Sequence, residues 1–122
     1  MAKFADKVNI LNTIYTIVVK NECDDERLKN STSAYCNYYK RQIVVCNGKS
    51  LPDAYNEYDE ASVDAYEKVN LRHEIVHAFL HESGLSFNSL PCSCWAKNEE
   101  MVDWFAFQSP KLFDAFMQAG AI

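Results

Sequence analysis

The chain has 122 residues, 48% of them hydrophobic, so it can fold as one packed domain over residues 1–122 but leaves no room for a separate substrate domain. Its formal net charge of −5 comes without a basic stripe, which argues against direct binding of nucleic acid. No segment is long and apolar enough to span a bilayer, and the N-terminus lacks the apolar core and cleavage signal of a secretory peptide, so we expect no membrane association.

The cysteine content indicates a reducing compartment. Five cysteines are an odd number, and without a secretory signal they are most simply interpreted as reduced thiols, which predicts a cytoplasmic protein. Two of them, Cys92 and Cys94, form a Cys-x-Cys pair, which is a weak metal-binding signal. A thiolate-rich site would close the open coordination position that catalysis needs, so we expect this pair to be structural. The others are Cys23, Cys36 and Cys46.

The first half of the chain favours β-structure. Residues 13–20 are rich in β-branched side chains and predict a strand, whereas the acidic, polar run 21–33 predicts a surface connection with at most a helical turn. Residues 35–39 and 41–46 predict either two strands of a hairpin or one bent strand. The chain then looks irregular up to Asp59.

The second half favours helices. A long helix is predicted to begin near residue 61 and to end at Gly84, which can adopt the left-handed conformation after a helix. A second helix is predicted over about 95–108, because apolar residues recur there at helical spacing. Ser109 and Pro110 are typical of a cap followed by the first residue of a further, short helix.

The long helix carries His73-Glu74-x-x-His77, the signature of zinc peptidases. Residues four apart lie one turn up the same helix face, so the two imidazoles can point at one ion. Glu74 leaves the helix beside them, where its carboxylate can reach a water at the metal and act as general base. The positions around the motif are apolar, as expected for a helix in an active-site wall. The sequence therefore predicts one Zn²⁺ per chain.

A catalytic zinc needs a third protein ligand, and Glu99 and Glu100 in the second predicted helix are adjacent candidates. Asn98, Glu99 and Asp103 match the Asn-Glu-x-x-x-Asp motif of the gluzincins, the thermolysin-like group in which a glutamate from a second helix completes the site. The chain resembles small gluzincins: the minigluzincins, the ImmA/IrrE-type peptidases, and short metallopeptidases of phages and prophages. The likeness is tight over residues 71–108 and loose before them.

This resemblance implies a role for each matching residue. Glu99 becomes the third ligand, with Glu100 as its rival, and Asp103 accepts a hydrogen bond from the non-coordinating nitrogen of His73. Asn98 is expected among the residues that support the ligands.

The resemblance also implies an α+β fold with a minimal zincin core, in which a small, mostly antiparallel sheet packs on the active-site helix and a second, ligand-bearing helix. An edge strand beside the cleft is then expected to pair with extended substrate. Residues 43–46 are the candidate strand, although they could equally form an ordinary interior strand. The predicted substrate-binding residues of this strand are Ile43, Val44 and Val45.

His81 continues the four-residue repeat of histidines, but eight residues of helix place it about 12 Å beyond His73, too far to share one ion. The metzincin motif fails because Leu80 and Ser83 stand where it needs glycine and a third histidine. We therefore expect His81 either in the pocket wall or at the C-terminal end of the helix, where a partial positive charge suits the helix dipole. Contact with the substrate is the alternative role. Hydrolysis also needs a donor to the oxyanion, and the sequence leaves five candidates open. They are Tyr35, Tyr38, Tyr39, Tyr66 and His81.

The predicted function is zinc-dependent hydrolysis of a peptide bond in a peptide or protein substrate, in the cytoplasm of a bacterial or phage-infected cell. Two other functions stay open. One is a zinc-binding regulatory or interaction module with the zincin fold and little turnover, and the other is a globule with a purely structural zinc. Glu74 argues against both, because a non-catalytic site has no need of a carboxylate there.

Overall fold

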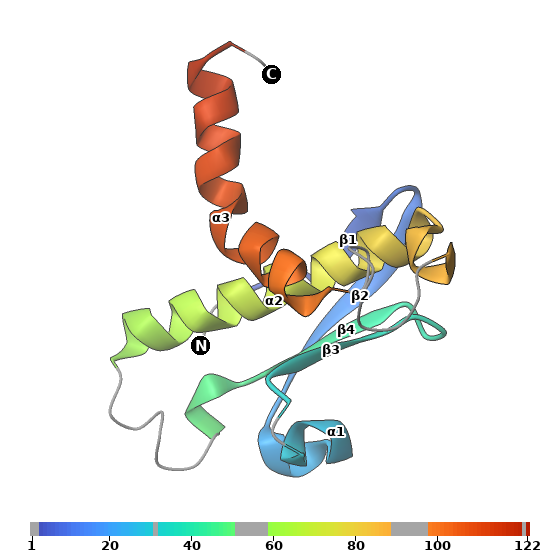
Figure 1. Ribbon diagram of the computed structural model, residues 1–122. Coiled ribbons are helices and arrows are strands. Elements are labelled where there is room, and N and C mark those ends of the chain that lie inside the picture. Colours follow the sequence, from blue (N-terminus) through green and yellow to red (C-terminus); the bar gives the residue numbers. More distant parts are fainter. Residues whose placement is uncertain (1–2, 31, 51–58, 89–97, 121) are drawn as a thin grey trace.

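The computed structural model describes residues 3–30, 32–50, 59–88, 98–120 and 122, and Figure 1 shows the arrangement of their elements. The first half of the chain supplies the strands, and the second half supplies two long helices, α2 (Glu60–Glu82) and α3 (Glu99–Gln118). The sheet packs on α2, and α2 packs on α3. The predicted α+β class, a small sheet packed on helices, is confirmed.

Four strands form one mixed sheet in the order β1-β2-β4-β3. Their bounds are β1 Lys7–Ile10, β2 Thr13–Lys20, β3 Ala34–Asn37 and β4 Gln42–Cys46. β2 and β4 run parallel, whereas β1 with β2 and β3 with β4 are antiparallel pairs, so the sheet is mostly antiparallel as predicted. The predicted strand 13–20 is confirmed, and so is the hairpin interpretation of the two later segments. The short helical turns of this half are η1 (Glu22–Asp24), α1 (Glu26–Lys29) and η2 (Gly48–Ser50).

The sequence did not predict β1. Its lysine and asparagine have weak strand propensity, so the segment carries little local signal. The strand forms because a tight turn at Leu11 and Asn12, with φ of 49° and 71°, folds it back onto β2. Ile10 is thereby buried completely in the core.

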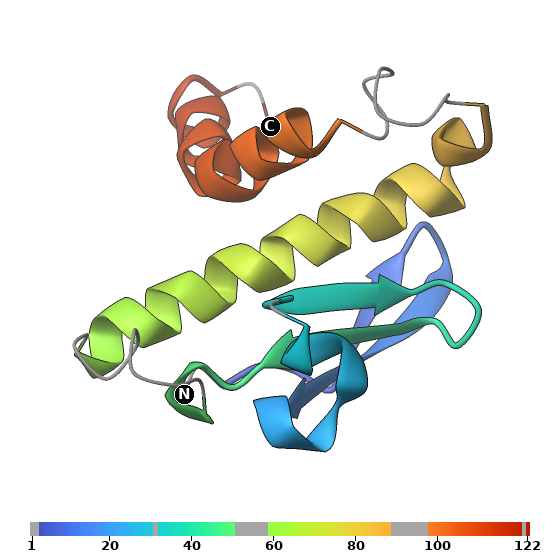
Figure 2. The same ribbon diagram turned by 60° about the horizontal axis from the view of Figure 1, so that its bottom comes forward.

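Different helices cover the two faces of the sheet, as Figure 2 shows. α2 crosses one face, where Cys36 and Ala78 belong to the same buried cluster. α1 lies against the opposite face, where Leu28 packs with Tyr35. Successive residues of a strand point to opposite faces, so β3 contributes side chains to both clusters. This alternation places the side chains of Ala34 and Cys36 on the face covered by α2 and that of Tyr35 on the face covered by α1.

β4 lies inside the sheet, between β2 and β3, and is not an edge strand. Ile43, Val44 and Val45 are 0% exposed. The prediction that this strand pairs with substrate, and that these three residues bind it, is therefore wrong. Their unbroken apolar run is the pattern of a strand covered on both faces, whereas a half-exposed strand alternates. The edge strand next to β4 is β3.

α2 begins and ends close to the predicted positions. The side chain of Asp59 caps its start by accepting a hydrogen bond from the amide of Ser62 at 2.8 Å. After its last residue, Glu82, the chain reaches Gly84 with φ of 85°, the left-handed conformation that ends helices. One further helical turn, η4 (Leu85–Asn88), follows.

α3 differs from the prediction. Residues 95–97, where its start was predicted, lie outside the described residues. The predicted stop at Gln108, with a separate helix from Ser109 and Pro110, is wrong because α3 continues through Pro110 to Gln118. Figure 1 shows α3 changing direction partway along its length. Proline lacks an amide hydrogen and crowds the preceding turn, which kinks a helix and need not end it.

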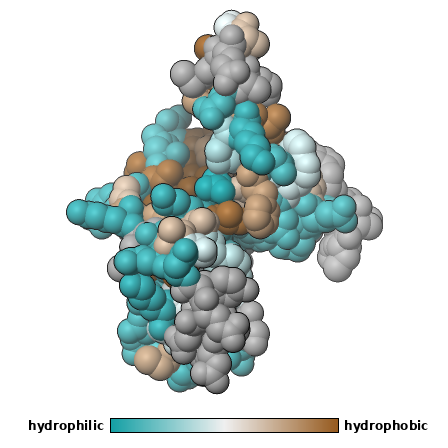
Figure 3. Space-filling view, turned by 90° about the vertical axis from the view of Figure 1, so that its left-hand side faces the viewer, coloured by the Kyte–Doolittle hydropathy of each residue, from teal (hydrophilic) through white to brown (hydrophobic). Residues whose placement is uncertain are grey.

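α3 leaves large hydrophobic side chains exposed, among them Trp104, Phe107 and Phe113. Figure 3 shows one face of the molecule, on which hydrophobic patches lie between hydrophilic residues. Across the described ranges, no helix has both the length and the apolar character needed to cross a membrane.

Candidate metal centre

α2 brings the three residues of the predicted motif together. Leu71, Glu74 and Ala78 are buried at helical spacing, and Leu71 and Ala78 pack in the core cluster with residues of the sheet. His73 and His77 are partly buried, one turn apart, and their Nε2 atoms lie 3.0 Å from each other. The two imidazoles therefore present their outer nitrogens to a single point beside the helix.

The first turns of α3 are fixed against α2 and carry Glu99 and Asp103 to that point. Val102 is fully buried between the helices, and Arg72 Nε donates a hydrogen bond to the carbonyl of Ala106. These contacts lie on both sides of Asp103, one turn beyond Glu99. The packing of the two helices thus positions both carboxylates.

Asn98 forms the start of α3. Its Oδ1 accepts a hydrogen bond from the amide of Met101 at 3.0 Å, and its carbonyl accepts one from Val102 at 3.1 Å. This is the bonding pattern of a helix N-cap. Asn98 therefore fixes the turn that carries Glu99, and its predicted role in supporting a metal ligand stays a prediction.

Glu99 completes a triangle of donor atoms with the two histidines. Its Oε2 lies 3.1 Å from His73 Nε2, and its Oε1 lies 3.0 Å from His77 Nε2. Zinc bonds to nitrogen and oxygen are ~2.0–2.1 Å long, so the ligand atoms of a tetrahedral zinc lie about 3.3 Å apart. The triangle fits that geometry. The donor set, two imidazoles and one carboxylate, also suits a zinc site with an open fourth position.

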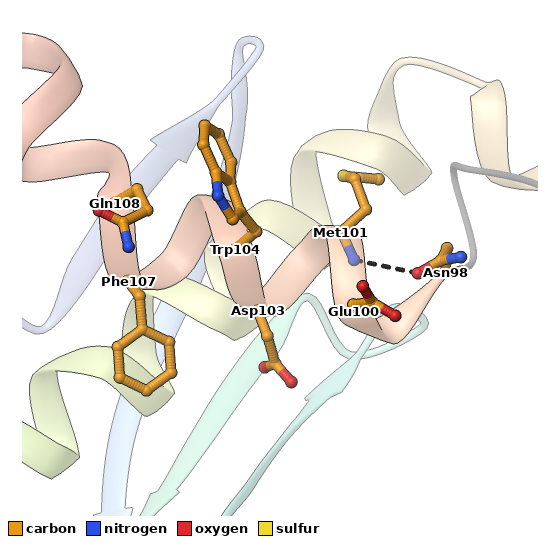
Figure 4. Close-up of a pocket in the computed structure, with 7 residues that line it drawn as sticks. All are labelled: Asn98, Glu100, Met101, Asp103, Trp104, Phe107 and Gln108. Atoms are coloured by element: carbon orange, nitrogen blue, oxygen red, sulfur yellow. Dashed lines mark hydrogen bonds between the residues drawn. The ribbon is translucent and has the colours of Figure 1, made fainter.

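Glu100, the rival ligand, is not in this group. It lines a neighbouring hollow of about 540 Å³ along α3, together with Trp104 and Phe107 (Figure 4). Glu99, by contrast, lies at the mouth of the candidate metal centre with 63% of its side chain exposed. The geometry agrees with the ligand assignment that the resemblance implies.

Asp103 holds the ring of His73. Its Oδ1 lies 2.5 Å from His73 Nδ1 on the side of the ring away from the triangle. An Nδ1–H that donates to this carboxylate leaves the lone pair of Nε2 free for a metal and fixes the orientation of the ring. This is the contact that the resemblance implies.

Replacing Asp103 with alanine is expected to weaken zinc affinity or activity by ~10- to 100-fold without unfolding the protein, because His73 loses the partner that fixes its tautomer. Asp114 is an exposed carboxylate farther along α3, so Asp114→Ala is a matched control. Zinc titration by competition with a chelating dye measures the effect. Equal affinities for the Asp103→Ala variant and the wild type would remove Asp103 from the site.

Glu74 is placed beside the triangle and outside it. Its side chain is buried, and its Oε1 lies 3.9 Å from His73 Nε2. Burial raises the pKa of Glu74 to about 7, and the nearby Glu99 carboxylate adds to the rise, whereas His73 and Arg27 oppose it. A carboxylate with a pKa near neutrality is suited to accept and return a proton. Burial also lowers the pKa of His77, which favours the neutral imidazole that a metal requires.

Comparisons of this chain with protein-family models, curated proteins and solved structures found no significant match. The gluzincin resemblance thus remains a prediction from the motifs. What the site can do has to be argued from its own geometry.

A cavity of about 360 Å³ opens in front of the triangle. α2 and α3 form one wall with the three candidate ligands and Glu74, and the edge strand β3 with the turn after it forms another. A third part of the lining comes from α1 and the segment before β3. The lining residues are Arg27, Thr32, Ala34, Tyr35, Cys36, Tyr38, His73, Glu74, His77 and Glu99.

The structure distinguishes among the four tyrosines that the sequence left as candidate oxyanion donors. The hydroxyl of Tyr35 donates a hydrogen bond to Asp25 Oδ2 at 2.6 Å, so that proton is committed elsewhere. The hydroxyl of Tyr66 lies 3.0 Å from that of Ser33, and Tyr66 is not a lining residue of the 360 Å³ cavity. Tyr39 is fully exposed. Tyr38 is the candidate that remains.

Tyr38 lies in the cavity wall and stacks on His81, with ring centroids 4.2 Å apart and planes 8° from parallel. His81 is therefore near the cavity but behind Tyr38, and it is not among the lining residues. Burial raises the pKa of Tyr38, which keeps its hydroxyl protonated and able to donate. His81 thus supports a wall residue, and direct contact with substrate stays a prediction.

Sequence reasoning did not select Arg27, Thr32, Ala34 or Cys36 as site residues. They lie far from the zinc motif in the sequence, and only the edge position of β3 brings them beside it. Only a correct prediction of the strand order would have identified these residues as part of the cavity.

Three cysteines of the described residues, Cys23, Cys36 and Cys46, are free. Burial raises the pKa of Cys36 to about 12, so the cavity holds a neutral thiol there. The Cys92 and Cys94 pair lies outside the described residues.

Proposed function

We propose that the protein is a zinc-dependent peptidase that hydrolyses a peptide bond in a peptide or protein substrate, with the cytoplasm of a bacterial or phage-infected cell as its setting. One observation carries the proposal. Three metal-ligand side chains converge at 3.0–3.1 Å, and a buried carboxylate, Glu74, lies next to them without belonging to them. A structural zinc site has no use for such a group.

Zinc in a site of this kind polarises the carbonyl and lowers the pKa of water toward ~7. The protein's own residues supply the rest of the chemistry. Glu74 takes a proton from the attacking water and returns it to the leaving amine. His73, oriented by Asp103, keeps the ligand geometry fixed during the reaction.

The outer edge of β3 offers a binding track for extended substrate. Cys46 donates a backbone hydrogen bond to the carbonyl of Ser33, and Tyr35 pairs with Val44. Because bonded pairs alternate along an antiparallel ladder, the backbone groups of Ala34 and Cys36 point to the outer edge. Both residues line the cavity. An added peptide strand can bond to them, which moves the predicted pairing from β4 to β3.

Tyr38 is the proposed donor to the developing oxyanion. Its replacement by phenylalanine keeps the ring that stacks on His81 and removes only the hydroxyl. We expect kcat to fall by ~10²- to 10³-fold, the usual effect of removing one such donor, with zinc content unchanged. Tyr39→Phe, which alters the adjacent but fully exposed tyrosine, is the matched control. A kcat within about twofold of wild type in the Tyr38→Phe variant would assign the donor elsewhere.

The proposed function is tested by digesting a broad library of peptides with zinc-loaded protein and identifying the products by mass spectrometry. We expect cleavage that stops when a chelator removes the metal and returns when zinc is added back, because the proposed mechanism needs the ion to polarise the carbonyl and to lower the pKa of the attacking water. Zinc-loaded protein that leaves every peptide intact would contradict the proposal. That result would favour the regulatory module with little turnover.

A further inference from the structure

The cavity has a wall that the proposed chemistry does not use. It is formed by Arg27 of α1, by Thr32 before β3 and by Tyr35 of β3, whose side chain lies on the face of the sheet opposite α2. Arg27 is the only lysine or arginine among the lining residues in the described part of the chain. A single cation therefore faces the space in front of the candidate metal centre.

The local structure holds Arg27 in place. Its guanidinium carbon lies 4.0 Å from the centroid of the Tyr35 ring, a cation–π contact that leaves the N–H groups at the rim of the guanidinium accessible. The Tyr35 hydroxyl is fixed by Asp25, which also accepts a hydrogen bond from the backbone amide of Arg27 at 2.9 Å. Leu28, the next residue, is fully buried against the sheet and anchors α1.

The cations near Arg27 are paired, and Arg27 is not. Lys20 lies 3.5 Å from Asp25, and Lys29 lies 3.1 Å from Glu26. No carboxylate of the described residues lies within ion-pair distance of Arg27, whose contact is the tyrosine ring. A preorganised guanidinium whose N–H groups are free is well suited to bind a carboxylate, because its fork of N–H groups matches the two carboxylate oxygens.

A peptide bound along β3 would place some of its side chains at Arg27. Side chains of an extended strand alternate between the two faces of a sheet, so alternate residues of the peptide point toward α2 or toward Tyr35 and Arg27. Both sets lie within one cavity of about 360 Å³, so the residue facing Arg27 is close to the scissile bond. The protein as a whole has a net charge of −5 and does not attract acidic peptides, so such a preference needs a local cation.

We propose that Arg27 is a specificity residue that binds a carboxylate of the substrate next to the scissile bond, either an acidic side chain or the free C-terminus of the peptide. This inference rests on the peptide-binding cavity of the proposed function, and it does not need hydrolysis to occur.

The test uses the zinc-loaded Glu74→Gln protein, which is expected to keep peptides intact, and the same protein with Arg27→Gln. Each captures ligands from an equimolar library of short acetylated peptides, made once with a free C-terminal carboxylate and once with a C-terminal amide. Lys29→Gln removes one positive charge from the same short helix outside the cavity and is the matched control. Mass spectrometry of the captured peptides gives the enrichment of each residue and of each terminus.

We expect peptides with a carboxylate to be enriched by ~10- to 100-fold over their neutral counterparts, as charge-assisted hydrogen bonds allow, and Arg27→Gln to abolish this enrichment. The Lys29→Gln control should keep it. Enrichment confined to free termini identifies the C-terminal carboxylate, and enrichment that survives amidation identifies an acidic side chain. Equal acidic enrichment with and without Arg27, no acidic enrichment, or no captured peptide at all overturns the inference.

The role of Arg27 and the proposed hydrolytic function can fail independently of each other. If the Glu74→Gln protein captures acidic peptides but the wild type cleaves none of them, the proposed hydrolysis is contradicted and the proposed role of Arg27 stands. If the wild type does cleave peptides, the comparison uses the pair that the capture experiment separates, either glutamate against glutamine or a free C-terminus against a C-terminal amide. The ratio of kcat/KM for the carboxylate-bearing substrate over its neutral counterpart should fall to about 1 in Arg27→Gln. The ratio is used because Arg27 also acts on the pKa of Glu74, so the absolute rates of the variant can change. An unchanged ratio would overturn the role of Arg27 and keep the hydrolase.

Discussion

Glu74→Gln is expected to lower peptide hydrolysis by ~10²- to 10⁴-fold while zinc content and fold stay those of the wild type. The amide has nearly the same shape as the carboxylate but cannot accept a proton from water. Glu74 lies 3.9 Å from His73 Nε2 and is not part of the donor triangle, so the ligands keep their places in the variant. The substitution also removes a buried ionisable group, and for that reason we expect no loss of stability.

The measurement is the initial rate on any peptide that the wild type cleaves, with metal analysis of the same samples. Glu60→Gln is the control, because Glu60 lies on the same helix but is an exposed carboxylate at its start, paired with Lys49. A Glu74→Gln variant as active as the wild type would refute general-base catalysis by Glu74. Loss of zinc together with activity would show instead that Glu74 is a ligand.

The sequence was sufficient to predict the site residues that lie within one helix. His73, Glu74 and His77 follow from the pitch of one helix, and their convergence needs nothing beyond α2 itself. Glu99 and Asp103 lie on a different helix, and no local periodicity says that α3 approaches α2. The resemblance to the gluzincin motif supplied that step, and the distances to His73 agree with it.

The parts that the sequence did not predict depend on pairing between distant segments. Whether β3 or β4 forms the edge is decided by the parallel pairing of β2 with β4, which places β4 inside. The same pairing determines that Ala34 and Cys36 line the cavity while Ile43 is buried. β1 forms through a turn with two positive φ angles, and α3 continues through Pro110, so in both cases local propensity was overridden.

Glu99→Ala is expected to abolish stoichiometric zinc binding, whereas Glu100→Ala should retain one zinc per chain. Glu99 contacts both histidine nitrogens at 3.0–3.1 Å, so its removal leaves two ligands where a catalytic zinc needs three. The loss should exceed the ~10- to 100-fold effect of removing a group that only supports a ligand, such as Asp103. Glu100 is adjacent in the sequence and equally acidic but lines the neighbouring hollow of α3, which makes it a matched control.

Thermal unfolding gives an independent readout of the same prediction. A ligand that binds only the folded state stabilises it by about 2.7 kcal/mol when its free concentration is 100 times its Kd, so zinc should raise the melting temperature of the wild type and of Glu100→Ala. The melting temperature of Glu99→Ala should not respond at the same zinc concentration. In the apo state, removal of Glu99 also takes away a carboxylate whose charge opposes ionisation of the buried Glu74, so the variant should fold without difficulty. The opposite pattern, in which Glu100→Ala loses its response to zinc and Glu99→Ala keeps it, would transfer the third ligand to Glu100 and reject the geometry of the triangle.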